Sequence, residues 1–311
     1  PNGQSPNYTQ NALWDDNGNL QFYVADGDIF NKNGNSMLLQ PPPSPSNFWV
    51  ENCNYPLGSL GYAEVAIVPV PQTCNEFYVI YTSLGWDNSV FPQDLSGYNE
   101  GKFFLIYFRV DMDLNNGNGA IVPHPNPDDP SIHWCQGHNI IELSTTAPSN
   151  KKDNDWGNVK ENWETHSQLL LGVTPENDDN KRYLFVTSFL DLNIFEISNT
   201  GISFMKVEMA DALQSVRGEL EVFERENEYV LAFPTVDLDI EQSSNKSIMI
   251  FIHLDKQSLS LTDFYLFDFY QAASYNFFPV AKGLEFSENG NFLYCTLIRL
   301  NVDFGDGSTY G

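Results

Sequence analysis

Basic residues are scarce in this chain. Only 15 Lys and Arg stand against 41 Asp and Glu among 311 residues, which gives a formal net charge of −26. Nucleic acids and anionic membrane surfaces are bound largely through cationic side chains, so we expect neither among the partners. High negative charge keeps an extracellular protein soluble and attracts divalent cations, but it does not identify a ligand.

Long apolar runs and cysteines are also few. The best apolar run, Ala63–Pro69, has only the length of a strand, so we expect no direct insertion into a membrane. The start at Pro1 rather than Met suggests a processed or trimmed N-terminus. The four cysteines allow three pairings, and a bridge between Cys53 and Cys74 would fit an oxidising compartment.

Helical patterns are nearly absent, whereas aromatic residues are abundant. The only helix-like stretch is around residues 203–217, and even that could be a strand followed by one turn. The 23 Phe and 15 Tyr suit half-buried strands. Alternating segments between Asn, Asp and Gly turns predict strands at 20–25, 29–31, 62–70, 76–83, 102–110, 120–122, 139–143, 168–173, 182–188, 192–197, 202–207, 219–224, 228–233, 247–254, 259–267, 283–287 and 291–298.

Five segments repeat one pattern, in which a polar turn precedes an aromatic and aliphatic strand. They read NGNLQFYVAD, CNEFYVIYTS, DNKRYLFVTS, ENEYVLAFPT and NGNFLYCTLI, and several follow another strand that ends in a turn. The later copies start near residues 181, 227 and 290, close to the period of a propeller blade with one long loop. We predict an all-β fold, namely a β-propeller of four-stranded blades that forms a single domain over residues 1–311. About five blades can be traced, the full protein could hold seven, and the fifth blade is unfinished, which suggests truncation at the C-terminal end.

These segments resemble a propeller-like region of large secreted proteins of Bacteroidota. The stretch NGNLQFYVADGDIFNKNGNSM matches the opening of that region through Gly18, Asn19, Leu20, Phe22, Tyr23, Asp26, Gly27, Ile29, Asn31 and Asn33. AEVAIVPVPQTCNEFYVIYTS, YFRVDMDLNNGNGAIV and GLEFSENGNFLYCTL are similar to later hairpins of the same region. The resemblance implies export by the type IX secretion system and a role in adhesion or gliding at the cell surface. It also implies that the chain is part of a longer polypeptide or assembly.

Two polar clusters bound the first predicted strands, Asp15–Asn19 and Asn31–Asn35. Their Asn and Gly residues could form a calcium loop, because oxygen ligands spaced in this way suit that ion. They are more simply the two turns around the innermost strands of the first blade. We therefore take this stretch as evidence of architecture.

Two further groups of residues are candidates for metal binding. Asp111, Asp113 and Asn115 alternate as at the start of an EF-hand loop and could hold Ca²⁺, although no Glu closes the loop and a hairpin turn is the favoured interpretation. His133, Cys135 and His138 offer imidazole and thiolate groups within one polar loop, as a zinc or copper site requires, although no standard zinc spacing is matched.

Four tryptophans are candidate ligand-binding residues because they are expected in long polar loops: Trp86, Trp134, Trp156 and Trp163. Such residues stack on sugar rings or anchor a protein partner, or else pack within their own loop.

The sequence favours a binding protein over an enzyme. It holds no Gly-x-Ser-x-Gly elbow, no His-Glu-x-x-His and no phosphate-binding Gly loop. We expect a non-enzymatic extracellular or cell-surface interaction and adhesion module that binds a protein or glycan through the loops at 41–61, 84–101 and 123–165. One alternative is a carbohydrate-active propeller enzyme acting on extracellular polysaccharide, because acidic residues are abundant enough to supply a carboxylate pair. Another is a structural subunit of an extracellular assembly.

Overall fold

The described part of the chain is all-β, as predicted. The computed structural model describes residues 10–25, 28–37, 49–50, 65–85, 102–122, 133–135, 138–143, 170–177, 180–188, 191–209, 219–237, 246–268 and 279–299. These residues form five sheets, named A to E in chain order, and contain no α-helix. The described residues include no helix long and apolar enough to cross a membrane.

Sheets A and B come from the first half of the chain. Sheet A has the order β1-β2-β3, and sheet B has the order β4-β9-β10-β7-β6-β5, with β8 paired to β7. The pair of β4 and β9 is parallel, whereas the other pairs of these two sheets are antiparallel. Their strands are β1 (Gln10–Trp14), β2 (Leu20–Ala25), β3 (Asp28–Asn31), β4 (Trp49–Val50), β5 (Ala66–Pro69), β6 (Glu76–Gly85), β7 (Lys102–Asp111), β8 (Ala120–Val122), β9 (His133–Cys135) and β10 (His138–Glu142).

Sheets C and D are four-stranded antiparallel meanders, and sheet E is a two-stranded hairpin. In each of them the spatial order follows the chain order, because consecutive strands are joined as hairpins. Their strands are β11 (Leu171–Val173), β12 (Arg182–Ser188), β13 (Asp191–Ser198), β14 (Gly201–Met209), β15 (Glu221–Glu224), β16 (Glu228–Asp237), β17 (Lys246–Asp255), β18 (Leu261–Asp268), β19 (Pro279–Phe286) and β20 (Leu293–Arg299).

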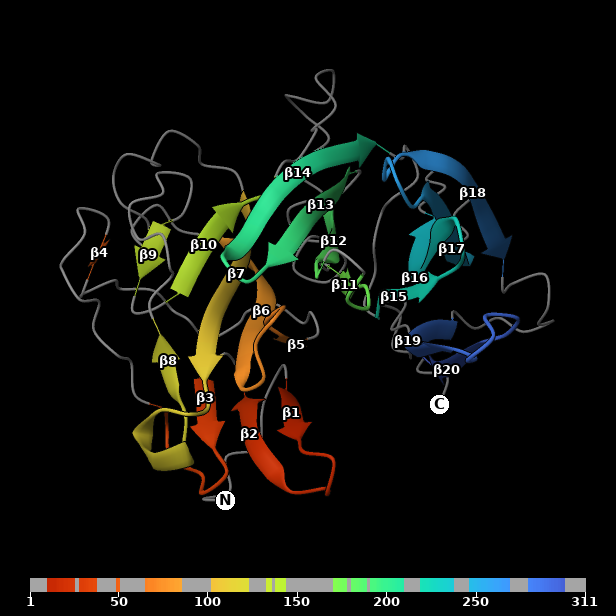
Figure 1. The fold of residues 1–311 in the computed structure, drawn as a ribbon. Helices are drawn as coiled ribbons and strands as arrows, with labels where there is room; N and C mark the ends of the chain where they lie inside the picture. The colour runs from red at the N-terminus through yellow and green to blue at the C-terminus, as the bar shows by residue number, and fades with distance from the viewer. Residues whose placement is uncertain are drawn as a thin grey trace, which may run out of the picture.

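The sheets stack face to face in chain order, so that sheets B, C and D each pack against a neighbouring sheet on both faces. Strand β6 shows the pattern, because Tyr78 and Ile80 pack against sheet C while Val79 and Tyr81 pack against sheet A. Successive side chains of a strand point to opposite faces, and aromatic or aliphatic residues at consecutive positions therefore cover both. Figure 1 shows the result as an arc of sheets, with sheets A and E at its two ends.

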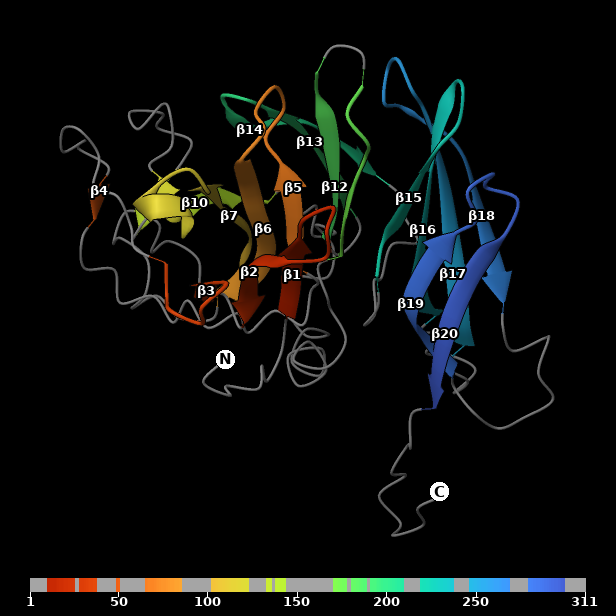
Figure 2. The ribbon, with the colours of Figure 1, turned by 60° about the horizontal axis from the view of Figure 1, so that its bottom comes forward.

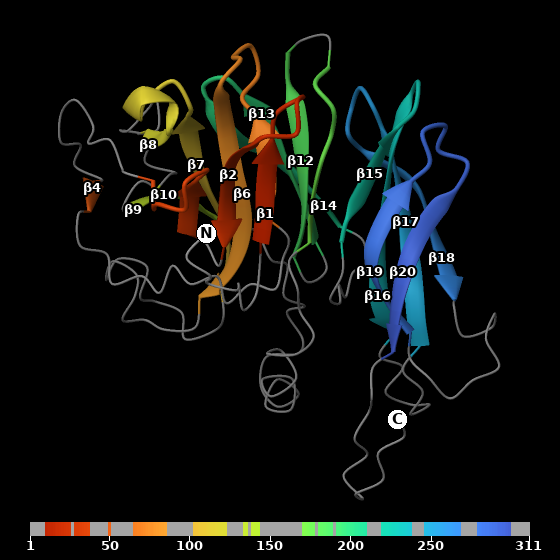
Figure 3. The same ribbon diagram turned by 90° about the horizontal axis from the view of Figure 1, so that it is seen from below.

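On the inner side of the arc, one edge strand of each sheet contacts an edge strand of the next sheet. Strand β1 contacts β5, β5 contacts β11, β11 contacts β15 and β15 contacts β19. Gly172 of β11 allows one of these approaches, since a Cβ atom there would lie 2.2 Å from Leu220 Cδ2 and 2.9 Å from the Leu220 carbonyl oxygen. The view from below in Figure 3 shows β1 of sheet A in front of sheet B, and β19 and β20 of sheet E in front of sheet D.

The fold confirms one expectation from the sequence and corrects another. Residues 203–209 of the helix-like stretch belong to β14, which pairs along the whole of β13, so the strand alternative is confirmed there. Residues 210–217 lie outside the described residues. Cys74 is a free, exposed thiol, so the bridge to Cys53 is not formed. Residue 53 itself lies outside the described residues.

Candidate functional site

The two polar clusters of sheet A are turns with one shared geometry. The Asp15 Oδ1 atom accepts the backbone N–H groups of Asn17 (3.0 Å) and Asn19 (2.7 Å). The Asn31 Oδ1 atom accepts those of Asn33 (2.9 Å) and Asn35 (3.2 Å) in the same way. Hydrogen bonds from the side chain and backbone of Asn19 hold the pKa of the Asp15 carboxyl below its ordinary value.

A glycine completes each of these turns in the left-handed region, Gly18 at a φ of 77° and Gly34 at 80°. The turn interpretation is confirmed, because the backbone N–H groups of Gly18 and Gly34 also donate to the carbonyls of Asp15 and Asn31 and so close each turn.

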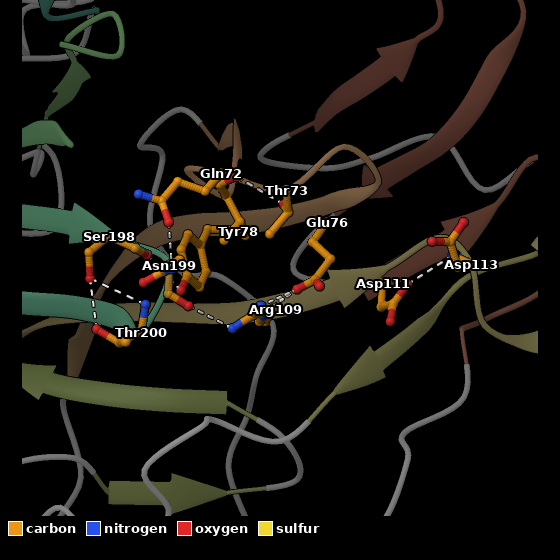
Figure 4. Close-up of polar contacts among 11 residues, drawn as sticks. Gln72, Thr73, Glu76, Tyr78, Arg109, Asp111, Asp113, Ser198, Asn199 and Thr200 are labelled. Carbon is orange, nitrogen blue, oxygen red and sulfur yellow. Dashed lines mark hydrogen bonds and ion pairs between the residues drawn. The ribbon is translucent and has the colours of Figure 1, made fainter. Parts of the chain in front are cut away.

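The loop after β7 has similar chemistry, and Figure 4 shows its first residues. Asp111 Oδ1 accepts the N–H of Asp113 at 2.9 Å, and Asp113 Oδ1 accepts the Asn75 amide at 2.8 Å. Asn115 follows at a φ of 53°, within a short 3₁₀ turn. The described residues contain no group of three or more His, Cys, Asp or Glu side chains that could hold a metal ion. Calcium at Asp111, Asp113 and Asn115 therefore stays a prediction.

The residues His133, Cys135 and His138 lie in strands, not in the loop that the sequence suggested. His133 and Cys135 belong to β9, and His138 begins β10. The register pairs Cys135 with His138, and His133 is two residues from Cys135, so the three positions fall on one face of the ladder. Their side chains lie outside the described part, and a metal site here stays a prediction.

The tryptophan candidates are only partly described. Trp134 lies in β9, opposite Trp49 of β4 and Asn139 of β10, so its placement in a loop was wrong. Strand pairing extends further into the polar segment than its Pro and Asn content indicated. Trp86, Trp156 and Trp163 lie outside the described residues, as do most of the loops expected to bind a partner.

A group of polar contacts that was not predicted from the sequence joins sheet B to sheet C, and we call it the polar junction. The Tyr78 hydroxyl donates to the Ser198 carbonyl at 3.0 Å, and Arg109 Nη1 donates to the Asn199 carbonyl at 2.9 Å. Arg109 also pairs with Glu76, and the Asn199 amide donates to Gln72 Oε1 at 3.1 Å (Figure 4). Desolvation by burial raises the pKa of Tyr78 to about 12. These contacts link strand ends of one sheet to the β13–β14 turn of the next, which is a structural role.

Among the described residues, most of the exposed large apolar side chains lie on sheets D and E, at the end of the arc away from sheet A. All four residues at 264–267 of β18 are about half exposed, namely Phe264 (46%), Tyr265 (53%), Leu266 (52%) and Phe267 (51%). Phe292 and Tyr294 beside and within β20 are each 63% exposed. We call these six residues the apolar surface, and Figure 2 shows sheet E against sheet D, where it lies. Tyr265 and Phe267 lie on the face of β18 toward sheet E, and Phe264 and Leu266 lie on its other face. Exposed aromatic and aliphatic side chains gathered in this way mark binding surfaces, so the apolar surface is the candidate functional site.

Charged residues border the apolar surface. The Tyr265 hydroxyl donates to Asp263 Oδ2 at 2.6 Å, which lowers the pKa of Asp263 and raises that of Tyr265. The His253 ring lies edge-on to the Tyr265 ring at 5.2 Å and bonds to Glu228 Oε2 through Nδ1 at 2.9 Å. That bond, together with one from Arg225, holds the pKa of Glu228 below its ordinary value. The arrangement orients the Tyr265 ring through its contacts with Asp263 and His253, and the nearby Glu228 carboxylate is paired with Arg225 and His253.

Comparison with known proteins adds no functional assignment. No protein-family model, curated protein or solved structure matches the chain.

Proposed function

We propose that this chain is a non-enzymatic interaction module built on a β-propeller scaffold and that its ligand is a protein. The apolar surface on β18 and β20 carries the proposal. Half-exposed aromatic and aliphatic side chains cost solubility, and a binding surface explains why they stay uncovered. Aromatic residues are also the side chains that dominate protein–protein interfaces.

The scaffold supports the same function. Face-to-face stacking of the sheets in chain order, with the first strands in contact along the inner side, is the packing that blades adopt in a propeller. In the proposed propeller, each of sheets A to E is one blade. A stack of this kind is rigid, and it presents edge strands and turns to a partner without a cost of reordering them.

The proposed location of the protein rests on its sequence. An extracellular or cell-surface location, with export by the type IX system, rests on the resemblance of the strand and turn segments to secreted Bacteroidota proteins. The net charge of −26 suits a protein that stays soluble outside the cell.

An array experiment tests the function. The chain, labelled on its amines, is applied to a panel of purified secreted glycoproteins and polysaccharides, and the release of reducing ends is measured in parallel. We expect saturable binding to a protein member of the panel without release of reducing ends. Binding confined to polysaccharides, release of reducing ends, or absence of any binding would contradict the proposal.

A further inference from the structure

We draw no further inference here: the strongest candidate, the apolar surface on sheets D and E at the end of the arc, belongs to the site already described, and nothing in the structure shows what covers it.

Discussion

The interface between sheets B and C differs from that between sheets D and E. Thirteen described residues are buried between B and C, and a polar junction around Arg109 and Tyr78 locks one edge. Only three described residues are buried between D and E, and half-exposed aromatic side chains border them. Face-to-face stacking therefore buries many described side chains between sheets B and C, in the middle of the arc, and few between sheets D and E, near its end. Coverage by the next sheet, rather than strand composition, separates buried from exposed apolar side chains among the described residues.

Truncation of a core side chain should change the free energy of unfolding most, and the change should differ between the two interfaces. Phe195 lies between B and C and is fully buried, so Phe195→Ala should lower the free energy of unfolding by about 4 kcal/mol through lost burial and a cavity. Leu284→Ala between D and E should cost about 2 kcal/mol, because the sparse packing there can relax. Urea denaturation monitored by fluorescence measures both. Equal losses would show that the two interfaces are packed alike.

Addition of a methyl group at Gly172, on the inner side of the arc, should have the next largest effect on stability. Gly172→Ala places a Cβ atom against Leu220, whose carbonyl oxygen cannot move aside as a flexible side chain could. We expect a loss of about 2 kcal/mol in the same denaturation experiment, since overpacking of this kind forces the backbone to shift. Gly18→Ala serves as a control for the glycine change, because its Cβ would meet no atom within 4 Å, although its φ of 77° also strains alanine. Similar costs at both positions would argue against close contact of the inner strands.

Removal of the junction hydroxyl should have a smaller effect that depends on pH. Tyr78→Phe loses the hydrogen bond to Ser198 and should cost about 1 kcal/mol at pH 7. The unfolded phenol loses its proton near its ordinary pKa of 10.0, whereas burial raises the pKa of folded Tyr78 to about 12. The folded state thus holds its proton more tightly, and stability is lost as pH rises from 10 toward 12.

The alkaline slope is the diagnostic measurement for this residue. Tyr78→Phe should flatten the fall in unfolding free energy above pH 10 without abolishing it, because burial also raises the pKa of Tyr229. An unchanged slope would show that Tyr78 is not desolvated at the junction between sheets B and C.

Changes on the apolar surface should have the smallest effect on stability. Tyr265→Ser combined with Phe267→Ser removes side chains that are 53% and 51% exposed, so the free energy of unfolding should fall by only about 0.5 kcal/mol. Binding of a hydrophobic reporter dye should fall, because exposed aromatic area is lost. A marked drop in the midpoint would mean that these residues support the core instead of facing a partner.

The sequence predicted much of this fold because strand and turn signals are local. Alternation and Asn/Gly turns located Leu20–Ala25, Ala120–Val122 and Arg182–Ser188 to the residue. Strand β9 was missed, since its pairing with β10 and β4 depends on distant segments and not on its own polar surroundings.

The candidate site was harder to predict, for a related reason. The run Phe264–Phe267 is as apolar as the buried segments of β6 and β7, and only the stacking of sheets decides which of these runs is covered. The Tyr78 and Arg109 junction joins residues 120 and 90 positions apart, which no short motif encodes.

Amide hydrogen exchange tests most directly whether the middle of the arc is better covered than its end. Strands β12 and β20 are both second in their sheets, but β12 pairs on both sides and β20 has one described partner. We expect β20 amides to exchange about a hundredfold faster than those of β12. Equal protection of the two strands would contradict the contrast between the two interfaces.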